Sequence, residues 1–93
     1  MNAPLDDITA FMGTLPPEEY ELRRRIRVAR NAASFKLRRT DSDNARALCW
    51  QVAETATAWV YATADLEALT EVAKLLRRLL SVADQFEAVE AMQ

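Results

Sequence analysis

The fold is decided by residues 16–39, which read PPEEYELRRRIRVARNAASFKLRR. The two prolines suit the entry of a helix, and the glutamates that follow lie where the helix dipole favours negative charge. Apolar side chains then recur at helical spacing, at Leu22, Ile26, Ala29, Ala33 and Leu37. This pattern predicts a helix from residue 17 to residue 39 with one apolar stripe that faces a core.

The same stretch carries a second stripe, which is made of arginines. Arg23, Arg27, Arg30 and Arg38 are spaced by four, three and eight residues, and this spacing keeps them on one face of the helix. Residues 17–39 hold eight of the 12 basic residues and only three acidic ones, although the whole chain has a net charge of −2. We therefore expect the arginine stripe, and not bulk charge, to be a partner-binding surface.

The remainder of the chain also predicts helices. Between Glu18 and Gln93 there is no Gly and no Pro, and good helix formers dominate. Residues 40–43 (TDSD) form the best break, where Asp41 or Ser42 can cap a helix at about 43–62. A weaker break at 63–65, with Thr63 or Asp65 as a possible cap, precedes a helix at about 65–92. The sequence leaves open whether these two helices are continuous.

The predicted fold class is all-α. Residues 1–93 are long enough for one domain and too few for two independent cores. Residues 4–12 predict a short N-terminal helix, and similar helix lengths with short connections favour an antiparallel bundle of three main helices. Hairpin dipeptides such as Asn-Gly are absent from the chain, which argues against a sheet.

More apolar side chains are present than one such bundle is expected to bury. On the first main helix, Val28 and Phe35 lie away from both stripes. On the second, Trp50 and Tyr61 lie nearly opposite its core stripe. The last helix has a heptad, widened on both flanks, that contains Leu69, Val72, Leu76, Leu79, Ala83 and Phe86. Such a surplus usually marks an interface, so we predict a homodimer or a stable partner that contacts Val28, Phe35, Trp50 and Tyr61.

The sequence shows no catalytic or metal-binding constellation. It has no His, and Cys49 is the only cysteine, so a structural zinc site and an intrachain disulfide are excluded. Cys49 has apolar neighbours and no His to activate it, which indicates inert packing. No phosphate-binding Gly-rich loop is present. We therefore expect no enzyme activity, no cofactor and no small-molecule substrate.

A cytoplasmic location is expected by default. No apolar run approaches the length of a membrane span, and the first residues lack the basic start and apolar core of a signal peptide. The leading hypothesis is a protein-binding module that acts as a regulator, inhibitor or adaptor. The alternatives are nucleic-acid binding through the arginine-rich helix 23–39 and a structural subunit of a larger assembly. The same residues also have simpler interpretations. The arginines can form a solvated face that is paired locally with acidic residues, and the aromatic rings can pack within the chain.

Overall fold

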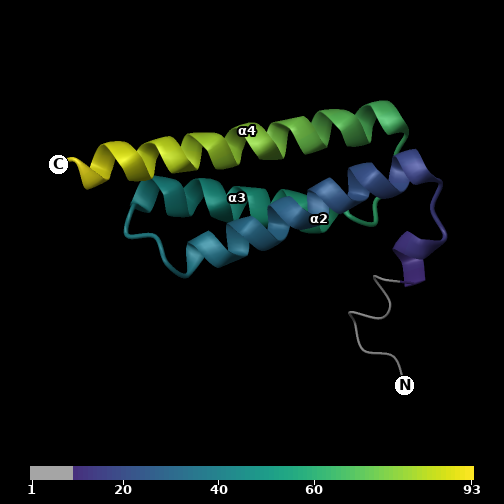
Figure 1. Ribbon diagram of the computed structural model, residues 1–93, viewed down its shortest axis with the longest axis horizontal. Helices are drawn as coiled ribbons and strands as arrows, with labels where there is room; N and C mark the ends of the chain where they lie inside the picture. Colours follow the sequence, from purple (N-terminus) through teal and green to yellow (C-terminus); the bar gives the residue numbers. More distant parts are fainter. Residues whose placement is uncertain (1–9) are drawn as a thin grey trace, which may run out of the picture.

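The computed structural model describes residues 10–93, and this part of the chain is helical without strands (Figure 1). Its three long helices are α2 (Pro17–Leu37), α3 (Asp43–Trp59) and α4 (Leu66–Ala91). Each packs against the other two, and α3 runs opposite to α2 and α4 (Figure 1). The predicted all-α bundle with antiparallel neighbours is therefore confirmed.

The short N-terminal helix is described only in part. Residues 10–13 are helical, while residues 4–9 of the predicted helix lie outside the described residues. Phe11 packs edge-on against Tyr61, with ring centroids 4.9 Å apart, and the guanidinium carbon of Arg23 lies 5.4 Å from the centroid of the Phe11 ring. This segment therefore lies at the end of the bundle where α2 begins and α3 ends.

The starts of α3 and α4 are set by local hydrogen bonds from the backbone to side chains. The Ser42 hydroxyl accepts a 3.0 Å hydrogen bond from the N–H of Ala45, and the Asp65 carboxylate accepts one of 2.8 Å from the N–H of Ala68. These two residues are the N-caps of α3 and α4, so the two helices are not continuous. The first two long helices end two to three residues earlier than predicted, at Leu37 and Trp59.

Small side chains dominate the core. Its fully buried residues on α2 are Ile26 and Ala33, and the fully buried core residues of the other elements are Ala45, Cys49, Val52, Ala56, Val60, Leu69, Leu76 and Ala83. Trp59 is half-buried and packs against this core. The many alanines let the helices approach closely, but they leave little volume in which to bury the chain's aromatic rings.

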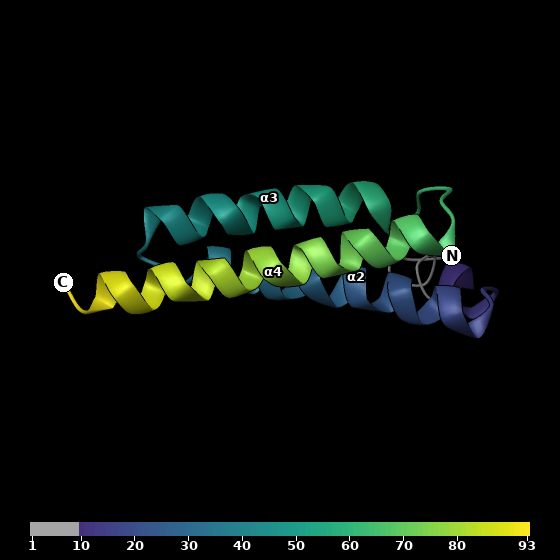
Figure 2. The same cartoon turned by 90° about the horizontal axis from the view of Figure 1, so that it is seen from above.

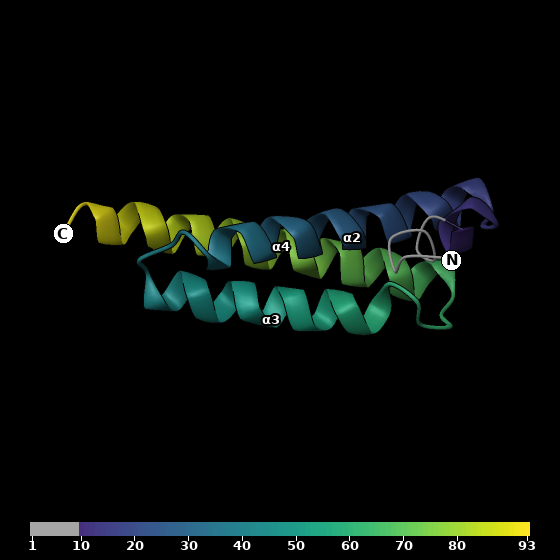
Figure 3. The same cartoon turned by 90° about the horizontal axis from the view of Figure 1, so that it is seen from below.

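The longest helix, α4, extends past the turn between α2 and α3, and its C-terminal end projects beyond the bundle in both rotated views (Figures 2 and 3). Its 26 residues span ~39 Å, against ~26 Å for the 17 residues of α3. Near this end, the Lys36 ammonium lies 2.7 Å from the Asp84 carboxylate and also contacts Glu87. These ion pairs join the end of α2 to α4.

Candidate functional site

The structure corrects the prediction for Arg23, which is buried and not available to a partner. Only 3% of the residue is exposed. Its Nη1 donates to the carbonyl of Val60 at 2.9 Å and, more weakly, to that of Trp59 at 3.4 Å, and its Nη2 donates to the carbonyl of Ala62 at 2.8 Å. Its Nε also forms an ion pair with Glu19 at 2.9 Å. Arg23 therefore donates hydrogen bonds to the backbone carbonyls at the C-terminal end of α3, which lack N–H partners within a helix.

The other three stripe arginines remain accessible to different extents. Arg27 and Arg30 are half-buried, and Arg38 is exposed next to the C-terminal end of α2. Within residues 10–93, none of the three forms an ion pair with a carboxylate. The predicted four-residue stripe is thus reduced to three cations, of which two are half-covered.

The predicted interface residues are all exposed, and they lie on different elements. Val28 is 47% exposed and Phe35 is 59% exposed, and both lie on α2. Trp50 is 61% exposed and lies on α3. Tyr61, 46% exposed, follows the end of α3, so it does not extend the α3 face of Trp50 and packs on Phe11 instead. Their exposure fits an interface role, which stays a prediction.

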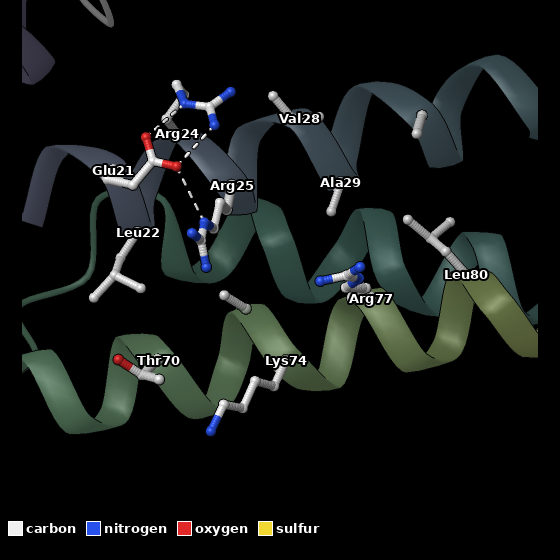
Figure 4. Close-up of a pocket in the computed structure, with 12 residues that line it drawn as sticks. Glu21, Leu22, Arg24, Arg25, Val28, Ala29, Thr70, Lys74, Arg77 and Leu80 are labelled. Atoms are coloured by element: carbon white, nitrogen blue, oxygen red, sulfur yellow. Dashed lines mark hydrogen bonds and ion pairs between the residues drawn. The ribbon is translucent and has the colours of Figure 1, made fainter. Parts of the chain in front are cut away.

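A groove between α2 and α4 was not predicted, and it is a concave surface lined by both helices (Figure 4). Its volume is about 450 Å³. The apolar side chains that line it are Leu22, Val28, Ala29, Ala32, Ala73 and Leu80. Alanines at three of these positions leave the space open, because their side chains fill little of the gap between the helices.

Charged side chains surround this apolar floor, and most of them are basic. They are Arg24 and Arg25 on α2, Lys74 and Arg77 on α4, and a single acid, Glu21. Glu21 lies between the two arginines of α2, 2.8 Å from Arg24 Nη2 and 3.1 Å from Arg25 Nε (Figure 4). Hydrogen bonds from Arg24 and then Arg25 lower the pKa of Glu21 to about 2, so it stays ionised at neutral pH.

The groove forms because particular faces of α2 and α4 meet. The sequence pattern of one helix does not show which face of another helix it contacts. One sequence signal pointed toward it: Ala73, Lys74 and Arg77 place small and basic side chains close together on α4. Their meaning depends on Ala29 and Ala32 of α2, about 40 residues away in sequence, which line the same groove.

Three further observations concern metal binding, the cysteine and membrane crossing. Within residues 10–93, no group of three or more Cys, Asp or Glu residues is placed to hold a metal ion. Cys49 is fully buried, and burial raises the pKa of its thiol, which disfavours the reactive thiolate. Among the described helices, none combines the length and apolar character that crossing a membrane requires.

Comparisons with protein-family models, curated proteins and solved structures give no match for this chain.

Proposed function

We propose that this chain is a non-enzymatic protein-binding module that acts as a regulator, inhibitor or adaptor, as a homodimer in the cytoplasm. The observation that carries the binding role is the groove between α2 and α4, with its apolar floor and basic rim. The partner that fits it is an amphipathic helix with apolar side chains on one face and acidic side chains beside them.

The size of the groove suits a short helix. Along α2 it extends from Glu21 to Ala32, a rise of ~16 Å, which is about three helical turns. Three turns offer three or four inward-pointing side chains at i, i+3, i+4 and i+7, enough to cover the alanine floor. Burial of this apolar area supplies affinity, because each buried square ångström contributes roughly 25 cal/mol.

The charges of the rim favour a partner with negative charge. Four cationic groups against one carboxylate give the rim a net charge of +3 on a chain whose total charge is −2. A local field of this kind speeds the approach of an acidic segment and disfavours a basic one. Lys74 already contacts Glu71 at 3.6 Å, whereas Arg77 forms no ion pair with any carboxylate of residues 10–93, so Arg77 is the strongest candidate contact.

Nucleic-acid binding through the arginine-rich helix is the second candidate. It is favoured by one observation, namely that Arg27, Arg30 and Arg38 lack carboxylate partners among the described residues. The burial of Arg23 weakens it, since the cation that begins the predicted stripe already binds backbone carbonyls. Binding of this kind loses affinity steeply as salt rises.

A matched pair of charge reversals separates the two candidates. The chain and its Arg77→Glu and Arg38→Glu variants are used as bait in lysate of the native host, with and without nuclease, and bound molecules are quantified by mass spectrometry. Both variants change the charge by two, and neither removes an ion pair recorded among residues 10–93. We expect Arg77→Glu to reduce recovery of nuclease-resistant partners at least tenfold, while Arg38→Glu leaves it unchanged.

The opposite result contradicts the groove. If recovery is lost with Arg38→Glu and with nuclease but persists with Arg77→Glu, the nucleic-acid candidate is correct. If both variants recover the same partners as the parent chain, neither basic surface is the binding site.

A further inference from the structure

The side of α2 that borders α3 carries cations that do not line the groove. Lys36 contacts Asp84 and so marks the α4 side of the helix, whereas Arg23 donates to carbonyls at the end of α3 and marks the α3 side. Arg27 and Arg30 follow Arg23 at intervals of four and three residues, so both lie along α3. Their half-buried state agrees with this position.

Helix α3 adds an exposed indole ring to the same border. Arg46 donates from Nη2 to the carbonyl of Thr40, just beyond α2, at 2.8 Å, so it marks the α2 side of α3. Asn44 donates to the carboxylate of Glu90 at 3.1 Å and marks the α4 side. Trp50 follows Arg46 by four residues, about one helical turn, and therefore lies on the α2 side. This tryptophan is 61% exposed.

The antiparallel packing of α2 and α3 fixes the height of this ring in the bundle (Figure 1). Arg23 binds the carbonyl of Val60, so these two residues lie at nearly the same level. Each step forward along α2 then matches one step back along α3. Trp50 precedes Val60 by ten residues and is therefore level with residue 33, which is ten residues after Arg23.

Cations lie on both sides of the ring along the helix axis. Arg30 lies ~5 Å from the level of Trp50, and Arg38 lies ~8 Å from it in the opposite direction. We call the surface made of Arg27, Arg30, Arg38 and Trp50 the α2–α3 seam. Its three arginines form no ion pair with a carboxylate of residues 10–93. Glu54 lies one turn after Trp50, and three cations against this one carboxylate leave a local charge of +2.

We infer that a single-stranded nucleic acid binds along the α2–α3 seam, with one base stacked on Trp50 and the neighbouring phosphates on Arg30 and Arg38. This inference rests on the nucleic-acid candidate described above, and it assigns that candidate a surface, a stacking residue and a single-stranded ligand. It does not involve the groove between α2 and α4.

The surroundings of Trp50 fit a base better than they fit an apolar protein surface. One turn to either side of it on α3 are the charged residues Arg46 and Glu54, and Ser34 of α2 lies near its level. A protein hot spot is usually enclosed by further contacts that exclude water, whereas this ring stands alone among polar side chains. A nucleobase offers a flat face for the ring and polar edges for such neighbours.

The same geometry selects unpaired bases. In a duplex, each base is already stacked between its neighbours and its face is covered, so an exposed ring on a protein surface gains little from it. In a single strand, every base has a free face, and a positively charged surface that follows the backbone holds the phosphates beside it. The seam combines these two features over the ~17 Å rise from Arg27 to Arg38.

Fluorescence titration with a short oligodeoxythymidine tests the stacking contact. In a Trp59→Phe background, Trp50 is the only tryptophan, so its emission reports on this site alone. We expect the single strand to quench this emission, and a duplex of the same length to bind more weakly and to quench it less. Circular dichroism checks that each variant is folded.

Salt dependence separates the cations from the ring. Arg30→Gln and Arg38→Gln should each weaken binding and make the slope of log affinity against log salt shallower by about 0.7, because each removes one phosphate contact. Trp50→Leu should weaken binding about tenfold and leave the slope unchanged, because stacking releases no counterions. Arg78→Gln on α4 is the matched control. Arg78 is exposed and has no ion pair within residues 10–93, so its replacement should change neither quantity.

The unfavourable outcomes have different meanings. No binding of the single strand at low salt overturns this inference together with the nucleic-acid candidate, but it leaves the groove to its own test with Arg77→Glu. Binding that weakens with Arg30→Gln and Arg38→Gln but not with Trp50→Leu overturns the stacked single strand and leaves the nucleic-acid candidate standing. Equal affinity for a poly-glutamate peptide of similar charge also overturns the inference, because negative charge alone is then recognised.

Discussion

Arg23 is expected to contribute more to stability than any other charged residue of the bundle, and Arg23→Met tests this directly. Methionine keeps much of the length and apolar surface of the arginine stem. The variant therefore removes the guanidinium without leaving a large cavity. The carbonyls of Val60 and Ala62 then lose donors that lie 2.9 Å and 2.8 Å from them.

The magnitude follows from these contacts. A hydrogen bond from a charged donor contributes roughly 1.5–3 kcal/mol, and a buried acceptor left without a partner costs roughly 1–3 kcal/mol. Removing a buried charge from the interior offsets part of this loss. The expected decrease in the free energy of unfolding is about 3 kcal/mol, which lowers the melting temperature of a domain of this size by roughly 12–24 °C.

Urea unfolding followed by circular dichroism measures this difference, with Arg38→Met as the control. Arg38 is exposed and has no ion pair within residues 10–93, so its replacement should change the free energy of unfolding by no more than about 0.5 kcal/mol. Arg23→Lys should give an intermediate loss, since one ammonium replaces the fork that reaches several carbonyls. The reasoning fails if Arg23→Met and Arg38→Met lose the same small amount.

Three further predictions concern the cap of α3, the ion pairs at the end of α2 and the exposed aromatic ring. Ser42→Ala should lower the free energy of unfolding by about 1 kcal/mol in the same urea assay, because the N–H of Ala45 loses its acceptor; an unchanged midpoint would contradict this. The ion pair with Lys36 lowers the pKa of Glu87, so the stability that this pair contributes is present above the ordinary pKa of 4.5 and is lost as the pH falls below that value. Lys36→Met should therefore make this loss of stability in acid smaller. An identical pH profile would count against the ion pair. Trp50→Phe should remove most of the tryptophan fluorescence that iodide quenches, because Trp50 is 61% exposed; quenching that persists unchanged would show that the ring is covered in solution.

The helices were predictable because their signals are local. The prolines at the start of α2 and the hydroxyl and carboxylate caps Ser42 and Asp65 act on backbone groups within three residues. The exposure of Phe35 and Trp50 also followed from helical periodicity alone. What a local pattern shows is the face of a helix on which a side chain lies.

The role of Arg23 was not predictable in this way. Its position on the helix was correct, but its environment depends on where α3 ends, and the carbonyls that it binds lie 37 and 39 residues further along the chain. The groove beside Arg77 depends in the same way on the meeting of α2 with α4. Helical periodicity places every arginine of a stripe on the same face of the helix. It does not show which of these arginines lie beside the unpaired carbonyls at the end of a neighbouring helix and which lie in solvent.

The distribution of large side chains across this bundle explains why association is the expected mode of action. The largest fully buried side chains in the described part of the chain include no aromatic ring; they are Ile26, Leu69, Leu76, Val52, Val60 and Cys49. Phe35, Trp50 and Phe86 instead lie on the outside of three different helices. An alanine-rich core fixes the positions of the helices with little room for rings, so the most hydrophobic side chains are displayed on rigid surfaces. Burying them in a complex is then the largest source of apolar free energy that this part of the chain still has available.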